Sequence, residues 1–169
     1  KLADQICSQV IHLIITCDAN GQLANYKTSS DKFVFILPPQ SNDKSLAMTG
    51  SYSGMLLTGI LMANYKNLSG IKDQVETLCS YGEHIINNYA HKIKSITEAD
   101  FKRAVFLGSG PFYGTATESH LKLQELTDGK IICKNDSFLG LRHGPKAVID
   151  ENTLMVYIFS NLDYVKQYE

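Results

Sequence analysis

The sequence predicts an α/β fold, a three-layer arrangement in which helices flank a parallel sheet of the flavodoxin or Rossmann type. Short apolar runs rich in β-branched residues, typical of buried parallel strands, alternate with longer stretches of helical periodicity. Turns rich in glycine, proline and asparagine separate the two kinds of segment. Strands that follow one another through helices imply parallel pairing with right-handed crossovers.

The first part of the chain contains two predicted strands. Residues 1–8 have the spacing of the C-terminal end of a helix, and the apolar run VIHLIIT at 10–16 predicts the first strand. A short helix over 22–26 leads to the second strand at 32–37, which two prolines end.

Two long helical stretches follow. One helix is predicted over 48–66, and residues 67–70 are interpreted as a linker. The amphipathic stretch over 71–93 is expected to join two sheet domains or to lie along a subunit contact.

The rest of the chain predicts a second set of α/β elements. A strand at 104–107 ends in a glycine-rich turn, and a helix over 114–127 follows. Further strands are predicted at 130–134 and 153–160, and the last residues are expected to turn into another helix.

The domain organisation expected from these elements is that of a fragment. The chain lacks an initiator methionine, opens within a predicted helix and closes at DYVKQYE. We expect residues 1–68 to be the C-terminal half of one domain, 69–98 a connecting helix, and 99–169 the N-terminal part of a second domain.

Composition bounds the function. The chain is 44% hydrophobic and 20% charged, which is ordinary globular composition, and its 16 basic and 17 acidic residues form no basic cluster. A partner such as nucleic acid or an anionic membrane therefore has no electrostatic support. The longest apolar stretch, MLLTGILMA, is too short to span a bilayer, and no signal peptide is recognised. The four cysteines, at 7, 17, 79 and 133, have no metal-ligand spacing, so we expect a cytoplasmic protein with no disulfide, no metal and no cofactor.

Three ionisable side chains of the predicted helix over 114–127 share a face. Glu118, Lys122 and Glu125 are spaced i, i+4, i+7, which at roughly 100° per residue returns them to nearly the same side. Two carboxylates and an ammonium suit proton transfer. The simpler alternative is an exposed helix whose Glu118–Lys122 pair contributes only ~0.3 kcal/mol.

Two further segments carry candidate site residues. Arg142 and His143 precede Gly-Pro, which forces the backbone out of regular structure and presents an imidazole, a side chain suited to proton transfer. Thr49 and Ser51 lie in the first turn of a predicted helix, where unpaired N–H groups suit a phosphate or sugar hydroxyl. Plain capping of that helix by hydroxyl side chains explains the same pattern without a ligand.

These residues carry a resemblance to a known family. ESHLKLQELTDGK, FLGLRHGPKAVID and NDKSLAMTGSYSGMLL resemble the sugar isomerase (SIS) domain proteins of the tagatose-6-phosphate ketose/aldose isomerase and galactosamine-6-phosphate deaminase type. The combination of E-x-x-x-K-x-x-E with R-H-G-P at this separation is specific, whereas each piece alone is not.

The resemblance implies roles for the candidate residues. Glu125 would be the base that removes the C2 proton, and His143 would open the sugar ring, in some relatives from the neighbouring subunit. Glu118 and Lys122 would frame the site, and Thr49, Ser51 and Arg142 would bind substrate.

The resemblance also implies partners. The substrate would be a phosphorylated sugar or amino sugar, and the assembly a homo-oligomer with a shared active site. The serine/threonine-rich phosphate loop of such proteins would precede Lys1, so the fragment alone is expected to be inactive.

Two other functions stay open. Gly108-Ser109-Gly110 after a strand, with Asp136 after the next strand, partly imitates an NAD(P)-binding fingerprint, although Tyr113 occupies the place of its third glycine. A non-catalytic SIS module that senses sugar phosphates is the other alternative.

Overall fold

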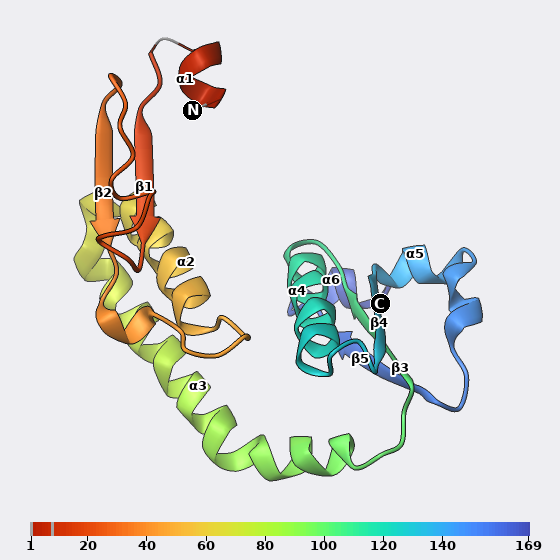
Figure 1. Cartoon of the computed structure of the whole chain (residues 1–169). Helices are drawn as coiled ribbons and strands as arrows, with labels where there is room; N and C mark the ends of the chain where they lie inside the picture. Colours follow the sequence, from red (N-terminus) through yellow and green to blue (C-terminus); the bar gives the residue numbers. More distant parts are fainter. Residues whose placement is uncertain (1, 8) are drawn as a thin grey trace. The chain divides into compact units, whose positions relative to one another are not determined.

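The computed structural model describes residues 2–7 and 9–169, which form two compact units, Lys1–His84 and Ile85–Glu169 (Figure 1). The two ends of the helix predicted at 1–8 lie outside the described residues, and its middle forms α1 (Leu2–Ile6).

The first unit contains a two-stranded parallel sheet. Strands β1 (His12–Thr16) and β2 (Lys32–Ile36) pair in the register His12↔Lys32, so both strands and their parallel pairing are confirmed. The short helix predicted over 22–26 is wrong, because this segment forms single turns. The Asn25 side chain donates hydrogen bonds to the carbonyl oxygens of Ala19 and Gly21, and such side-chain bonds compete with helix formation.

Two 3-10 turns and two α-helices follow this sheet. A 3-10 turn, η1 (Pro39–Ser41), precedes α2 (Gly50–Ala63), and a second one, η2 (Tyr65–Asn67), leads directly into the thirty-residue helix α3 (Leu68–Thr97). The linker predicted over 67–70 is therefore wrong. A glycine such as Gly70 costs only about 1 kcal/mol in a helix, which a long helix tolerates.

The second unit is a three-stranded parallel sheet in the order β4-β3-β5, with the first strand in the middle. This is the beginning of the flavodoxin-type strand order. Its elements are β3 (Arg103–Gly108), α4 (Pro111–Leu126), β4 (Ile132–Asp136), α5 (Phe138–Arg142), η3 (Pro145–Val148), β5 (Thr153–Ile158) and α6 (Asp163–Lys166). The predicted mixed α/β class, with parallel sheets flanked by helices, is confirmed.

Boundaries in this unit differ from prediction by two or three residues. Helix α4 starts at Pro111 rather than 114, because a proline fits the first helical position without loss of a hydrogen bond. Strand β4 starts at Ile132 rather than 130, because Asp128 and Gly129 have φ of 54° and 72° and turn the chain after the helix.

The core of the second unit lies on both faces of β3, which is its most buried strand. On one face Ala104 and Phe106 pack with Ala116 of α4. On the other face Val105 and Leu107 pack with Phe138 and Leu141 of α5. Val148 of η3 and Met155 of β5 lie against this cluster. Helix α4 therefore covers one face of the sheet, and α5 and η3 cover the other, which gives three layers (Figure 1).

Candidate functional site

The three ionisable side chains of α4 form one connected group. The ammonium of Lys122 lies 2.8 Å from Oε2 of Glu125 and 3.6 Å from Oε1 of Glu118. The predicted common face is therefore confirmed. The side chains of Glu118, Lys122 and Glu125 remain 38%, 26% and 35% exposed, so the group is shielded by its neighbours but still open on one side.

The packing of α4 directs this group away from its own sheet. Ala116 is fully buried against β3, and Lys122 lies six residues further on, about 240° around the helix. The close approach of α4 to β3 requires Gly108, because a Cβ there would lie 2.2 Å from the carbonyl oxygen of Phe112. Gly108 thus determines how closely the first turn of α4 packs on β3, and with it the position of the charged face of α4.

The electrostatics of the group keep Lys122 charged. The hydrogen bond to the Glu125 carboxylate, with a further contribution from Glu118, raises the pKa of the Lys122 ammonium above its ordinary value. An ammonium held beside a carboxylate can orient that carboxylate as a base. It can also stabilise negative charge that develops on a substrate oxygen.

Arg142 and His143 lie at the end of α5. The helix is started by Ser137, whose hydroxyl accepts a hydrogen bond from the Gly140 N–H at 2.9 Å. His143 follows the last helical residue and is exposed, and the Arg142 guanidinium donates a hydrogen bond to the backbone oxygen of Glu169 at 3.1 Å.

The structure does not bring His143 to the α4 group within one chain. Helix α5 packs on the Val105 and Leu107 face of the sheet, whereas α4 packs on the Ala104 and Phe106 face. The sheet therefore separates the imidazole from the carboxylates, a separation that no spacing in the sequence reveals.

Thr49 and Ser51 lie at the start of α2, as predicted. The backbone N–H groups that were expected to be free for a ligand there are already hydrogen-bonded within the chain. The carboxylate of Asp43 accepts hydrogen bonds from the N–H groups of Gly50 and Ser51 and from the Ser51 hydroxyl, at 2.7–2.8 Å. These bonds, those from Ser51 foremost, lower the pKa of Asp43 to about 2. The Thr49 side chain makes no capping bond and is exposed.

Asp43 was missed in the sequence because it lies seven residues before the helix, outside the spacing of ordinary capping motifs. A ligand phosphate at this end of α2 would be repelled by the Asp43 carboxylate, which already occupies the backbone N–H groups. Ser51 and Thr49 could contact a sugar hydroxyl more readily than an anion.

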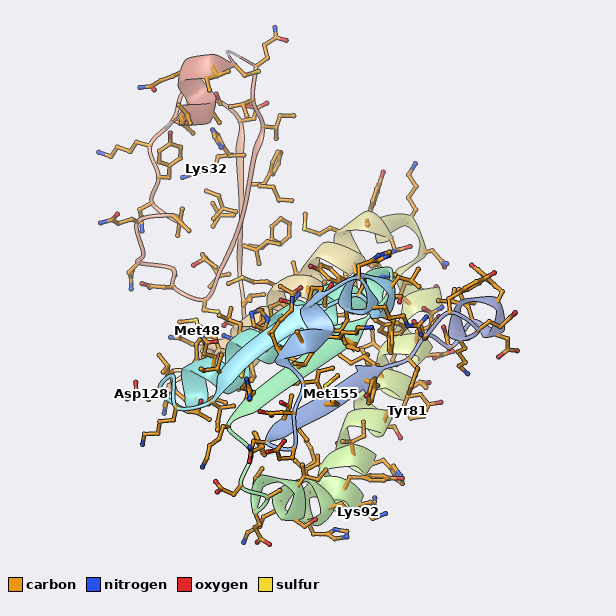
Figure 2. The ribbon with its side chains drawn as sticks, turned by 90° about the vertical axis from the view of Figure 1, so that its right-hand side faces the viewer. Lys32, Met48, Tyr81, Lys92, Asp128 and Met155 are labelled. Carbon is orange, nitrogen blue, oxygen red and sulfur yellow. The ribbon has the colours of Figure 1, made fainter. Side chains whose placement is uncertain are left out.

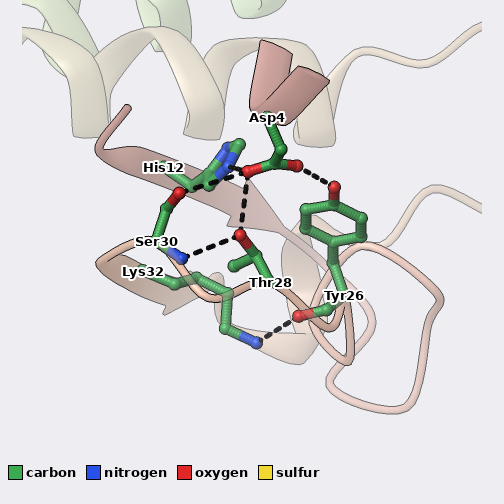
Figure 3. Close-up of polar contacts among 6 residues, drawn as sticks. All are labelled: Asp4, His12, Tyr26, Thr28, Ser30 and Lys32. Carbon is green, nitrogen blue, oxygen red and sulfur yellow. Dashed lines mark hydrogen bonds and ion pairs between the residues drawn. The ribbon is translucent and has the colours of Figure 1, made fainter. Parts of the chain in front are cut away.

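A second polar cluster, in the first unit, was also missed (Figure 3). The Asp4 carboxylate lies 2.6 Å from Nε2 of His12 and accepts hydrogen bonds from the hydroxyls of Tyr26, Thr28 and Ser30. The bonds from Tyr26, His12 and Thr28, in that order, hold the pKa of Asp4 well below its usual range.

This cluster joins α1 to β1 and to the segment before β2. A cleft of about 990 Å³ beside it is lined by His12, Tyr26 and several amide side chains. His12 is the first residue of β1, whereas ligands of parallel α/β sheets bind at the carboxyl ends of the strands. We therefore interpret the Asp4 cluster as structural.

Within residues 2–7 and 9–169, no group of His, Cys, Asp and Glu side chains has the arrangement of a metal site. Over the same residues, no helix combines the length and the apolar character that a membrane span needs.

Solved structures show what the chain is similar to. No family model matches the sequence. A possible tagatose-6-phosphate ketose/aldose isomerase of Clostridium novyi NT superposes with a TM-score of 0.93 at 45% identity, over 99% of this chain and 43% of that one. The tagatose-6-phosphate ketose/aldose isomerase of Escherichia coli superposes with a TM-score of 0.86 at 34% identity, over 99% of this chain and 45% of that one. The resemblance to proteins with sugar isomerase domains is thereby confirmed.

A curated relative is similar over the same span of the chain. D-galactosamine-6-phosphate deaminase AgaS of Shewanella sp. (strain ANA-3) is 36% identical over 170 residues, which cover 100% of this chain and 43% of the relative. The chain is thus similar, over its whole length, to proteins named as deaminases of galactosamine-6-phosphate and as isomerases of tagatose-6-phosphate. It spans less than half the length of these relatives.

Proposed function

We propose that the complete protein interconverts or deaminates phosphosugars by enediol-type proton transfer, with galactosamine-6-phosphate or tagatose-6-phosphate as substrate. The observation that carries the proposal is Lys122, bound between Glu118 and Glu125 on the outward face of α4. The names of the relatives, an isomerase and a deaminase, support the same chemistry.

In the proposed mechanism Glu125 moves a proton between C2 and C1 of the open-chain sugar. It takes the proton from C2 of galactosamine-6-phosphate and returns it at C1, and with tagatose-6-phosphate, whose C2 is the carbonyl carbon, it takes the proton from C1 and returns it at C2. Lys122 fixes the carboxylate through the 2.8 Å contact and stabilises the negative charge of the enediol-type intermediate. Glu118 holds the ammonium from its other side. If C2 carries an amino group, the same shift gives a ketimine, which water hydrolyses to a ketose and ammonia.

His143 would supply the acid/base step that opens the ring, and Arg142 would contact the substrate. Because the sheet separates His143 from the α4 group in one chain, we propose that the imidazole reaches the site from another copy. The active site would then be shared within a homo-oligomer. The partial exposure of Glu118 and Glu125 agrees with a site that further protein must cover.

The first test measures ammonia release from galactosamine-6-phosphate and isomerisation of tagatose-6-phosphate by the complete protein. Glu125→Gln keeps the shape of the side chain and removes its basicity, so we expect kcat to fall by roughly 10²–10⁴ with little change in KM. Glu151→Gln, an exposed carboxylate in the same unit, is the matched control and should not lower kcat. Wild-type kcat in Glu125→Gln would remove the assigned base. Substrate binding without turnover by the unmodified protein would favour a sensing module.

The second test asks where His143 acts. His143→Ala should lower turnover of the cyclic substrate more than that of an open-chain analogue. Subunits carrying Glu125→Gln and subunits carrying His143→Ala, mixed during refolding or co-expression, should regain about a quarter of the wild-type activity if each site in a dimer takes its glutamate and its histidine from different copies. Mixtures as inactive as the parents would place both residues in one copy.

A further inference from the structure

Helix α3 carries large apolar side chains that are exposed. Its side chains Leu78, Ile86 and Ile93 are 68%, 69% and 53% exposed. Figure 2 shows the side chains along this helix, with Tyr81 and Lys92 labelled. Large apolar side chains that gather on one exposed helix face mark a contact surface.

The apolar residues form one narrow band, which we call the α3 stripe. At 100° per residue, eight of them lie within about 40° of the direction of Gly82. They are Leu68, Ile71, Val75, Leu78, Ile86, Tyr89, Ile93 and Ile96. A stripe of this width is the seam expected of one helix packed against another.

Gly82 lies at the centre of the stripe. A Cβ at this position would meet nothing within 4 Å, as at Gly59 and Gly114, so the space beside Gly82 is open. In a helix interior a glycine costs roughly 0.5–1 kcal/mol relative to alanine. Close approach of a second backbone at this point would explain it.

The stripe is symmetric about Gly82. Val75 and Tyr89 lie seven residues before and after it, and Leu78 and Ile86 lie four residues before and after it. Ile71 and Ile93 form a third pair at eleven residues. Two copies of α3 that cross antiparallel at Gly82 would therefore place apolar residues opposite apolar residues along the whole contact.

The charges of α3 favour the same arrangement. Before Gly82, Asp73 and Glu76 outnumber Lys72. After Gly82, Lys92 and Lys94 outnumber Glu83. An antiparallel pair brings the acidic half of each helix to the basic half of the other, whereas a parallel pair sets like halves together.

We propose that α3 is a homodimer contact, in which the α3 stripes of two copies pack antiparallel across a two-fold axis at Gly82. The contact is isologous, because each residue meets the residue equally far from Gly82 in the other copy. This inference is independent of the reaction proposed above, and it assigns a surface to which no catalytic role has been given.

Cross-linking of the complete protein tests the geometry directly. Cys79→Ala first removes the natural thiol of α3, and Gly82→Cys is added to this background. Cysteines at the crossing point lie within the roughly 4.4–6.8 Å Cα separation of a disulfide, so oxidation should give a covalent dimer. Leu78→Cys in the same background should not cross-link to itself, because the two copies of residue 78 lie about 12 Å apart along the axis. Leu78→Cys combined with Ile86→Cys should cross-link.

Particle mass in solution is the second measurement. Leu78→Glu places a charge in the stripe and should halve the particle mass, whereas Ser80→Glu, the same charge on the opposite face of α3, should leave it unchanged. Three outcomes overturn the proposal: no disulfide at position 82, equal cross-linking at 78 and 82, which indicates parallel helices, or a folded Leu78→Glu variant of unchanged mass. The first would show that another part of the same protein, or nothing, covers α3.

Discussion

The substitution Gly108→Ala tests how the sheet positions the proposed catalytic helix. Gly108 is the last residue of β3, and an added Cβ would lie 2.2 Å from the carbonyl oxygen of Phe112 and 2.5 Å from its carbonyl carbon. Real Cβ atoms essentially never approach closer than 3.0 Å, so the first turn of α4 must move by the difference between 3.0 and 2.2 Å, about 0.8 Å. Glu118, Lys122 and Glu125 move with it.

Two effects of this displacement can be measured. Overpacking of this kind costs about 1–3 kcal/mol, and each kcal/mol lowers the melting temperature of a domain of about 150–250 residues by roughly 2–4 °C. A misplacement near 1 Å can lower catalytic turnover by up to ~10²-fold. Thermal unfolding and kcat of the complete protein, measured side by side, give both values.

Gly114→Ala is the matched control. Gly114 lies on the same helix, and a Cβ there would meet nothing within 4 Å. Alanine in a helix interior is favoured over glycine by roughly 0.5–1 kcal/mol, so this variant should melt at an equal or higher temperature. If Gly108→Ala and Gly114→Ala have the same stability and the same kcat, the close packing of α4 on β3 does not position the site.

Two further predictions concern stability. Phe138→Ala empties a core position that is 4% exposed and should lower the free energy of unfolding by about 3–5 kcal/mol, whereas the adjacent Leu139→Ala, 53% exposed, should have a far smaller effect; chemical denaturation compares them. Asp43→Asn should lower the melting temperature at pH 7. Because hydrogen bonds depress the folded-state pKa of Asp43 to about 2, their stabilisation is complete above the unfolded pKa near 3.9 and is lost as pH falls toward 2. The difference from the unmodified protein should therefore shrink between pH 4 and 2, and a constant difference would contradict the capping role.

Elements with a strong local signal could be predicted from the sequence. The apolar, β-branched runs predict the strands β1, β2, β3 and β5, and the long apolar periodicity predicts helix α3. Burial of apolar side chains dictates both patterns. Helix α5 was not predicted from the sequence. Its five residues are too short for a helical period to show, and it depends on Ser137 and on core packing of Phe138.

Some features of the candidate site could also be predicted from the sequence, and others could not. The shared face of Glu118, Lys122 and Glu125 follows from helix geometry alone and could be predicted. The capture of the α2 N-terminus by Asp43 could not, since it depends on a loop that folds back over seven residues. The position of His143 across the sheet from α4 depends on which face each crossover takes, which only the three-dimensional structure specifies.

The strand order β4-β3-β5 has a consequence for the growing polypeptide. Arg103 of β3 pairs with Thr153 of β5, so a ribosome must add fifty further residues before that edge of the central strand finds its neighbour. Until then the nascent chain presents an open row of backbone donors and acceptors, the kind of edge that recruits other chains. The contacts of β3 with α4 and β4 are shorter in sequence and can form earlier, but until β5 is made the β5 side of β3 stays open, as does the outer edge of β4.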